Sequence, residues 1–312
     1  MRALEAALAA RRALGLPSAS TDAYRLVHAE GEGAITVDVY GRHLVASVYS
    51  DEVDAAWLDA LAELDAYDGV YLKHRPKQAN EVREQERKQR APEHAVRGQD
   101  APAPLIIREN GVPFEVRLGD GFSTGIFLDQ RDNRARLMDM ARDKSVLNLF
   151  SYTCGFGLVA AFAGAARTVN LDVAKNVLER GRANYALSGL SGEFLARDVL
   201  ESLPRLRRRE ERFDIVVLDP PSYASTKRGR FSVERDYPQL AELAIELLAD
   251  GGTLLACLNH HKLGEDDLRT ALQLAAGRAG RRIASLAFAQ VPADHAPARG
   301  RAPHLKSAWM RI

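Results

Sequence analysis

Short apolar runs and longer amphipathic stretches alternate along the second half of the chain. Each apolar run ends in a polar loop, which is the pattern of buried strands in a sheet. Most intervals between the runs are long enough for a helix, and crossover helices are what connects neighbouring parallel strands. We predict strands over 146–150, 168–172, 193–196, 213–218, 252–258, 283–290 and 305–311.

The last two predicted strands are connected in another way. Residues 291–304 between them are rich in Pro, Gly and Arg and leave no room for a crossover helix of normal length. A connection of this kind joins antiparallel neighbours. The pattern therefore predicts a seven-stranded, doubly wound α/β sheet in which one strand is reversed.

The first third of the chain carries short strands and turn signals instead. Apolar and polar residues alternate around Gly41, which predicts a hairpin, and Asn110-Gly111 is a strong signal for a second hairpin turn. The full set of expected elements is a helix at the N-terminus, strands over 34–40, 43–49 and 69–73, a helix over 51–65, a loop or solvated helix over 75–104 and a hairpin over 105–118. We predict a small α+β domain over residues 1–118 and place the large sheet in 119–312.

Composition supports two domains and limits the class of partner. A chain of 312 residues exceeds the usual size of one domain. Its 43 Lys and Arg nearly balance 42 Asp and Glu, so any surface for nucleic acid has to be local. Two cysteines give no disulfide framework, which is typical of a reducing compartment. Charges interrupt the first apolar run, unlike in a secretion signal, and no run is long enough for a membrane span, so we expect a cytoplasmic protein.

Carboxylates follow the second and third strands of the predicted sheet. Asp172 and Asp198 come where these strands end, and Gly155 and Gly157 follow the first strand. In an open α/β sheet this edge binds nucleotide-like cofactors, whose hydroxyls and amines donate to carboxylates. Glycines there let a cofactor approach the backbone closely. A methyl-donor site fits this layout best, although simple turn geometry would explain the glycines and helix capping would explain either aspartate.

Asp219-Pro220-Pro221-Ser222-Tyr223 is the sharpest motif in the chain. Two prolines after a strand-end aspartate remove two backbone donors and stiffen the loop, so the carboxylate and the carbonyls become fixed acceptors. Such acceptors can hold the amine of a planar base, and Tyr223 offers a ring on which a base can stack. The alternative is a purely structural turn.

Basic residues occur close to this motif and again farther away. Directly after the motif come Lys227, Arg228, Arg230 and Arg235, which could contact phosphates or form solvated surface. The run over 205–209 contains four arginines, and we interpret it as solvated surface because it lies far from the strand ends. His260 and His261 have no carboxylates or cysteines at ligand spacing, so contact with a phosphate or a base is favoured over metal binding.

The chain also resembles a known family. The motifs that carry the resemblance are 24–33, Phe122 to Arg134, Leu147 to Thr153, Asp219-Pro-Pro221 and Ala293-Asp-His295. They resemble the S-adenosylmethionine-dependent methyltransferases of large-subunit ribosomal RNA, the family that contains the 5-methylcytosine enzymes of 23S rRNA. The resemblance implies a class I methyltransferase sheet preceded by a smaller α+β domain that faces the RNA.

The resemblance also implies a cofactor, a partner and a set of binding residues. The cofactor would be S-adenosyl-L-methionine and the partner RNA, with 23S rRNA first. Cofactor contacts would come from Phe150, Ser151, Tyr152, Thr153, Gly155, Asp172, Asp198 and Asp219, with Gln130 and Arg131 in a segment that flanks the pocket. Substrate contacts would come from Pro220, Pro221, Lys227, Arg228, Arg230 and His260.

Two departures from the family pattern change the expected chemistry. Family members begin with a small RNA-binding domain, and this chain starts after its position, so we expect RNA affinity to come from elsewhere. The 5-methylcytosine enzymes need a cysteine after the fifth strand, because a thiolate must add to carbon 6 before carbon 5 can attack. Asn259 stands at that position, and Cys257, two residues earlier, would need a shifted loop to serve.

An asparagine at this position resembles the relatives that methylate N7 of guanine, a nitrogen whose in-plane lone pair needs only correct placement. We therefore expect methylation of a ring or exocyclic nitrogen of RNA, guanine N7 first, with Asp219, Asn259 and Tyr223 as the catalytic residues, and Asn259 donating to guanine O6. The alternatives are methylation of a small aromatic metabolite and a catalytically silent cofactor- or RNA-binding assembly factor. The sequence leaves a homodimer open and predicts no metal.

Overall fold

A computed structural model describes residues 2–28, 35–50, 52–75, 88–226, 229–260, 262–297 and 303–312, with only the backbone for 224–226 and 229–230. The chain divides into two compact units. The first contains Met1–Leu128 and Pro292–Arg301, and the second contains Asp129–Val291 and Ala302–Ile312. The sequence placed the boundary near residue 118 and gave 292–301 to the second domain. The structure assigns 292–301 to the first unit because the Asp294 carboxylate accepts a hydrogen bond from the backbone N–H of Arg25, 2.9 Å away.

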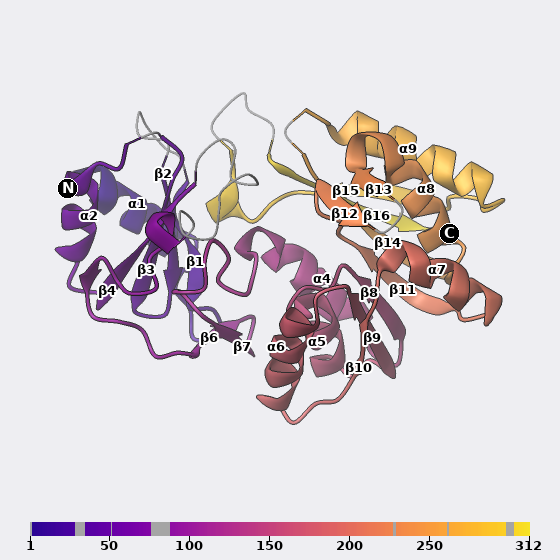
Figure 1. The fold of residues 1–312 in the computed structure, drawn as a ribbon, viewed down its shortest axis with the longest axis horizontal. Coiled ribbons are helices and arrows are strands. Elements are labelled where there is room, and N and C mark those ends of the chain that lie inside the picture. The colour runs from indigo at the N-terminus through magenta and orange to yellow at the C-terminus, as the bar shows by residue number, and fades with distance from the viewer. Residues whose placement is uncertain are drawn as a thin grey trace. The chain divides into compact units, whose positions relative to one another are not determined.

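The first unit is built on a five-stranded sheet in the order β1-β2-β3-β4-β5 (Figure 1). Only the β3–β4 pair is parallel, and α2 lies between these two strands in the chain, as a parallel connection requires. Leu4 of α1 and Leu58 and Leu61 of α2 share one apolar core with the strands. The elements are α1 (Arg2–Ala13), β1 (Ala23–His28), β2 (Ile35–Tyr40), β3 (His43–Val48), α2 (Ala55–Ala62), β4 (Gly69–His74) and β5 (Arg97–Gly98).

Both predicted hairpins are present in this unit. The first is β2–β3, and the second is β6 (Leu105–Glu109) with β7 (Val112–Val116). Asn110 and Gly111 have φ of 50° and 82°, as a tight hairpin turn with two left-handed residues requires. The segment expected to be a loop or solvated helix contains β5, which pairs with β4, while its residues 76–87 lie outside the described part of the chain.

The second unit contains the predicted seven-stranded sheet, in the order β10-β9-β8-β11-β14-β16-β15. All neighbours are parallel except β16, which is antiparallel to both β14 and β15. The reversed strand and its antiparallel neighbour were thus predicted correctly. The strands are β8 (Ser145–Leu149), β9 (Arg167–Asp172), β10 (Glu193–Ala196), β11 (Phe213–Leu218), β14 (Leu248–Asn259), β15 (Ser285–Ala289) and β16 (Leu305–Arg311).

Helices cover both faces of this sheet (Figure 1). Leu203 of α7, Leu240 of α8 and Leu272 of α9 pack into one large core with the strands, whereas α5 and α6 adjoin β8, β9 and β10. This arrangement is the expected class I methyltransferase architecture, a doubly wound sheet with one reversed strand. The remaining elements are η2 (Leu128–Gln130), α4 (Arg131–Met140), α5 (Gly155–Phe162), α6 (Lys175–Ala186), α7 (Val199–Arg208), β12 (Tyr223–Thr226), β13 (Gly229–Ser232), α8 (Val233–Ile245), α9 (Glu265–Arg278) and η3 (Ala293–His295).

Candidate active site

The sheet order of the second unit places its polar strand ends together. The chain runs from β8 to β9 and β10 on one side and continues with β11 and β14 on the other side of β8. Ligands bind outside the carboxyl ends of the strands at such a reversal. The residues at these ends are the loop 150–154 after β8, Asp172, Asp198 and Asp219. The structure therefore brings the predicted strand-end residues to one edge of one sheet.

The loop after β8 has an unusual backbone that the sequence did not indicate. Phe150, Tyr152 and Cys154 have φ of 55°, 49° and 63°, the left-handed region that non-glycine residues seldom adopt. Such residues cost about 1–3 kcal/mol each and cluster at ligand sites, where the surroundings hold them in place. The surroundings here are two hydrogen bonds to β9: the Ser151 N–H donates to the Leu171 carbonyl at 3.0 Å, and the Tyr152 N–H donates to the Asp172 carboxylate at 2.9 Å.

Asp172 and Asp198 both accept hydrogen bonds from backbone N–H groups. One carboxylate oxygen of Asp172 accepts from the Tyr152 N–H, and the other accepts from the Ala174 N–H at 2.9 Å, just before α6. Asp198 is the N-cap of α7 and accepts from the Glu201 N–H at 3.1 Å. The capping roles are thus present in the structure. A carboxylate has about four lone-pair sites, so each group retains acceptor capacity for a ligand.

Gly157, near the start of α5, lies close to the side chains of Asn170 and Tyr185. A Cβ on Gly157 would lie 2.1 Å from Asn170 Oδ1 and 2.7 Å from the Tyr185 hydroxyl. Gly157 therefore allows α5 to pack closely on β9, which is a structural reason for a glycine at this position. Its two neighbours belong to a buried polar chain, in which Asn148 donates to Asn170, Asn170 donates to Tyr185 and Tyr185 donates to Thr168, each at 3.0 Å.

Asp219 ends β11 and is fixed by a chain of hydrogen bonds that begins at β16. The indole N–H of Trp309 donates to Asn133 Oδ1 at 3.1 Å, so the Asn133 amide nitrogen points the other way and donates to Gln130 Oε1 at 2.7 Å. The Gln130 amide nitrogen in turn donates to Asp219 Oδ2 at 3.0 Å. Because an indole nitrogen can only donate, it sets the direction of every amide in this chain. Gln130 is buried and reaches the carboxylate, whereas Asn133 and Trp309 were not predicted to take part.

Burial dominates the electrostatics around Asp219. It raises the pKa of the Asp219 carboxyl to about 7, and the negative charge of Asp129 acts in the same direction, while the Gln130 hydrogen bond opposes both. The Cys257 thiol is fully buried and accepts from the Gln130 amide at 3.3 Å. Burial and the nearby Asp219 raise the pKa of this thiol well above its ordinary value. Because the thiolate is the nucleophilic form of cysteine, this burial disfavours a nucleophilic role for Cys257.

Asn259 ends β14, two residues beyond Cys257. Its backbone carbonyl accepts a hydrogen bond from the Ser222 hydroxyl, which ties the loop after Pro221 to this strand end. Its side-chain Oδ1 is buried and has no hydrogen-bond partner in the described part of the protein. An orphaned buried acceptor carries a desolvation cost of about 1–3 kcal/mol that a donor from a ligand would relieve. This oxygen is the clearest unfilled polar position at the strand ends.

Tyr223 and His260 form a pair beside Asn259. Their rings meet edge to face at 6.0 Å, and the Tyr223 hydroxyl lies 3.2 Å from His260 Nε2. Tyr223 is 54% exposed, so a stacking partner can reach it. The His260 side chain is buried, and its ring also faces Glu234 at 3.6 Å. We therefore place His260 behind Tyr223 as its support, away from the surface where a phosphate could reach it, while the expected contact with a base stays a prediction.

The other predicted substrate and cofactor residues have varied settings. Pro220 is buried and Pro221 is exposed. Arg131 is buried at the start of α4, with its Nε 3.7 Å from Asp132. Arg235 pairs with Asp236 at 2.8 Å on the surface. Lys227, Arg228 and the Arg230 side chain lie outside the described part of the structure.

Among the described residues no group of three His, Cys, Asp or Glu could hold a metal ion, and no helix is long and apolar enough to cross a membrane.

Comparison with known proteins gives consistent matches. A model of the S-adenosylmethionine-dependent methyltransferase family matches residues 82–292. Ribosomal RNA large subunit methyltransferase I of Aeromonas salmonicida is 35% identical over 74% of the chain and 59% of that relative. The ribosomal RNA large subunit methyltransferase of Deinococcus radiodurans is 32% identical over 99% of the chain and 78% of that relative. The chain thus spans about three fifths of the length of several curated relatives.

A solved structure resembles the whole chain. The crystal structure of SMU.776, complexed with SAH, has a TM-score of 0.86 and 29% sequence identity, and the match covers 99% of this chain and 80% of that one. The similarity extends over both units, so each has a counterpart in a structure that contains the demethylated form of a methyl donor.

Proposed function

Because the chain belongs to the family of S-adenosylmethionine-dependent methyltransferases, we propose that it transfers a methyl group from S-adenosyl-L-methionine to a base of RNA, with 23S rRNA as the first candidate. The observation that carries this proposal is the set of acceptors Asp172, Asp198 and Asp219 at the carboxyl edge of the second unit, beside the loop after β8. Both curated relatives described above are named as methyltransferases of large-subunit ribosomal RNA. The smaller first unit would then face the RNA.

The residues at the carboxyl edge fit the proposed cofactor. The spare lone pairs of Asp172 suit ribose hydroxyls, and those of Asp198 suit an adenine amine. The strained loop from Phe150 to Thr153 and Gly155 would line the cofactor, with Gln130 and Arg131 beside it. When bound, the cofactor supplies an electrophilic methyl group on a positively charged sulfur. Asp219, held by Gln130, is the carboxyl nearest the proposed reacting centre.

The burial of Cys257 supports a nitrogen as the acceptor atom. Addition to a pyrimidine ring needs a thiolate, and Cys257 is fully buried with a raised pKa. A ring nitrogen such as guanine N7 needs no covalent adduct and no base, because its lone pair is already available. The protein then only has to place the base. Tyr223 provides a ring for stacking, and the two prolines keep the loop stiff.

Asn259 would read the base through its orphaned oxygen. The sequence indicated that this side chain donates to guanine O6 through its amide nitrogen, and the buried Oδ1 without a partner adds an acceptor. It therefore suits an amine of the base, such as the amino group of guanine. Pairing with that amine would satisfy the oxygen and fix the orientation of the ring.

The test is to identify the methylated nucleoside. 23S rRNA from cells with and without the gene is digested and analysed by mass spectrometry, and the rRNA lacking the modification is then treated with purified protein and labelled cofactor. We expect one 7-methylguanosine to be missing without the gene and restored by the protein. Equal modification in both strains, together with no incorporation in vitro, would refute the proposal, and a product methylated on carbon would refute the choice of nitrogen.

Matched variants connect the product to the site. Asn259→Ala should lower kcat/KM about ten- to a hundredfold, the range expected for losing a buried hydrogen bond to substrate. Cys257→Ala serves as the control at the same strand end and should remain within a few-fold of the parent enzyme. The reverse order of effects would favour the covalent route.

A further inference from the structure

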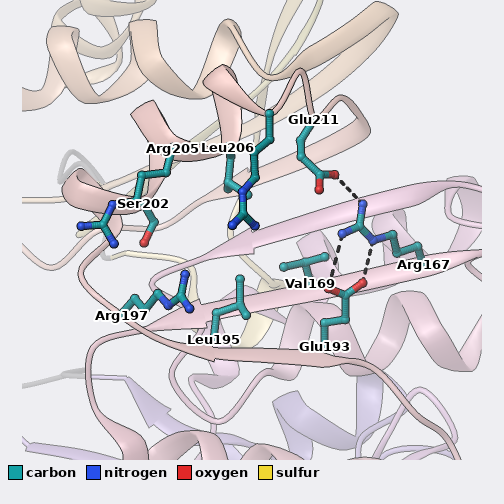
Figure 2. A pocket seen from close by; sticks show the side chains of 10 residues that line it. Arg167, Val169, Glu193, Leu195, Arg197, Ser202, Arg205, Leu206 and Glu211 are labelled. Carbon is teal, nitrogen blue, oxygen red and sulfur yellow. Dashed lines mark hydrogen bonds and ion pairs between the residues drawn. The ribbon is translucent and has the colours of Figure 1, made fainter.

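A hollow lies in the larger unit, between β9 and β10 on one side and α7 on the other (Figure 2). Its volume is about 140 Å³. This is well below the roughly 300–1,000 Å³ of pockets for drug-sized ligands and equals the share of about five water molecules in the liquid. The hollow is lined by Arg167, Val169, Glu193, Leu195, Arg197, Ser202, Arg205, Leu206, Arg209 and Glu211.

At one end of the hollow, an arginine is already paired with carboxylates. Arg167 donates to Glu193 at 2.7 Å and to Glu211 at 2.6 Å, which Figure 2 shows as a bridge between the two carboxylates. The Arg167 guanidinium also lies 5.4 Å from the centre of the Phe213 ring. Both carboxylates of the lining are thus occupied by one arginine.

Three further arginines line the hollow without equivalent partners. Arg197 follows β10, Arg205 lies in the last turn of α7, and Arg209 is the residue directly after α7. The carboxylate nearest to Arg205 in an ion pair is that of Glu201, at 4.0 Å. Within the described ranges, the Arg197 and Arg209 side chains donate no hydrogen bond to a carboxylate. Four guanidinium groups against two carboxylates leave the lining with an excess of two positive charges.

A structural explanation covers only part of this arrangement. Basic residues in the last turn of a helix stabilise its macrodipole, and α7 ends in such residues. This accounts for Arg207, which pairs with Glu246 at 2.7 Å and does not line the hollow, and in part for Arg205, which also lies in the last turn. It does not account for Arg197, which comes from a different element. Like charges one helical turn apart also destabilise a helix slightly, so Arg205 and Arg209 would gain from an anion between them.

From this charge and size we propose that the arginine pocket, defined by Arg197, Arg205 and Arg209, binds a backbone phosphate of the RNA acceptor. The inference rests on the proposed function and adds a phosphate contact to it. Guanidinium groups bind phosphate oxygens by charge-assisted, often bidentate hydrogen bonds. β10 is the edge strand of the sheet, and Arg197 directly precedes Asp198 at the carboxyl edge. The pocket extends from Arg197 at this edge toward the amino ends of β9 and β10, where Arg209 lies, so an RNA strand held here would run along the edge strand toward the candidate active site.

The earlier interpretation of this run changes accordingly. From the sequence, residues 205–209 were interpreted as solvated surface, because the run was placed on a helix far from the strand ends. The structure brings two of these arginines to the same hollow as Arg197, whose lining also contains Val169, Leu195 and Leu206. Apolar groups in the lining lower the local dielectric, which strengthens the attraction between the arginines and an anion.

The test measures RNA affinity as a function of salt. A triple variant, Arg197→Gln, Arg205→Gln and Arg209→Gln, is compared with a control that loses the same charge at exposed arginines outside the pocket: Arg142→Gln, Arg208→Gln and Arg282→Gln. The probe is large-subunit rRNA transcribed in vitro. We expect the pocket variant to bind about ten- to a hundredfold more weakly at low salt, and its slope of log K against log[salt] to fall by about 0.7, the value for one phosphate of a single strand.

Each outcome has a distinct meaning. The control should keep the slope of the parent protein, and all three proteins should bind the cofactor equally, which shows that they are folded. If the pocket variant behaves like the control while the parent binds and methylates rRNA, the inference is wrong and the proposed function stands. If the parent neither binds nor methylates rRNA, both fail. Saturable binding of inorganic phosphate that the triple variant abolishes, without any change in RNA affinity, would also overturn the inference, since the pocket would then serve free phosphate.

Discussion

Replacing Gly157 by alanine would test whether the close packing of α5 on β9 holds the candidate site in place. The new Cβ would lie 2.1 Å from Asn170 Oδ1, where contacts below 3.0 Å are essentially never seen. Asn170 and Tyr185 are buried and hydrogen-bonded on either side, so neither side chain can simply turn away. The helix has to move, or the buried polar chain has to break.

The expected loss is the sum of two costs and one gain. Overpacking of a tight interior costs about 1–3 kcal/mol, and a buried polar group without its partner costs about 1–3 kcal/mol. Alanine favours the helix by about 1 kcal/mol over glycine. The free energy of unfolding should therefore fall by about 3 kcal/mol, which shifts the midpoint of urea unfolding by roughly 1 M.

A matched control is available in α9. Gly277 also lies in a helix, but a Cβ there would meet nothing within 4 Å, so Gly277→Ala should stabilise the protein by about 0.5–1 kcal/mol. The assay is urea unfolding followed by tryptophan fluorescence in a Trp57→Phe background, which leaves Trp309 of the second unit as the only tryptophan. If Gly157→Ala were as stable as the control, the geometry inferred for α5 and β9 would be wrong.

Three further predictions concern the residues around Asp219. Burial raises the pKa of its carboxyl from 3.8 to about 7, so the folded state favours the protonated form; its contribution to stability is complete below about pH 4 and lost as pH rises through about 7. The free energy of unfolding, measured with urea across this pH range, should fall in the parent protein and change less in Asp219→Asn. Identical pH profiles of the two proteins would contradict the raised pKa of Asp219. Gln130→Glu should weaken cofactor binding in calorimetry, because a carboxylate would replace the donor at 3.0 Å; unchanged affinity would remove Gln130 from the site. Tyr223→Phe should keep activity within a few-fold while Tyr223→Ala loses about tenfold or more in kcat/KM, since stacking needs the ring and not the hydroxyl; equal losses would point to the contact with His260 instead.

The strands were predictable from the sequence because burial determines their composition. The apolar runs predicted β8 and β9 to within one residue, and they gave β10, β11 and β16 with their observed bounds. β14 begins at Leu248, four residues before the prediction, because Leu248 pairs with Phe213 across a register shift and the exposed residues between interrupt the apolar run. A pattern of burial cannot show a pairing that passes through exposed positions.

The polar contacts of the site were less predictable, for two different reasons. Phe150, Tyr152 and Cys154 are not residue types that favour a left-handed backbone, so no local signal announces the strained loop. The hydrogen-bond chain from Trp309 to Gln130 requires contact between α4 and β16, which lie far apart in the sequence. Hydrophobic periodicity does not show which distant elements are in contact. Strand-end aspartates could be recognised because their position follows from chain order alone.

The return of Pro292–Arg301 to the first unit has a consequence for how such a protein can change over generations. No single break point separates the two units, so one crossover between related genes cannot exchange the first unit intact. It would leave the Arg25 N–H without the Asp294 carboxylate that accepts from it. Exchange of the intact first unit requires crossovers at three points. The two units should therefore be inherited together.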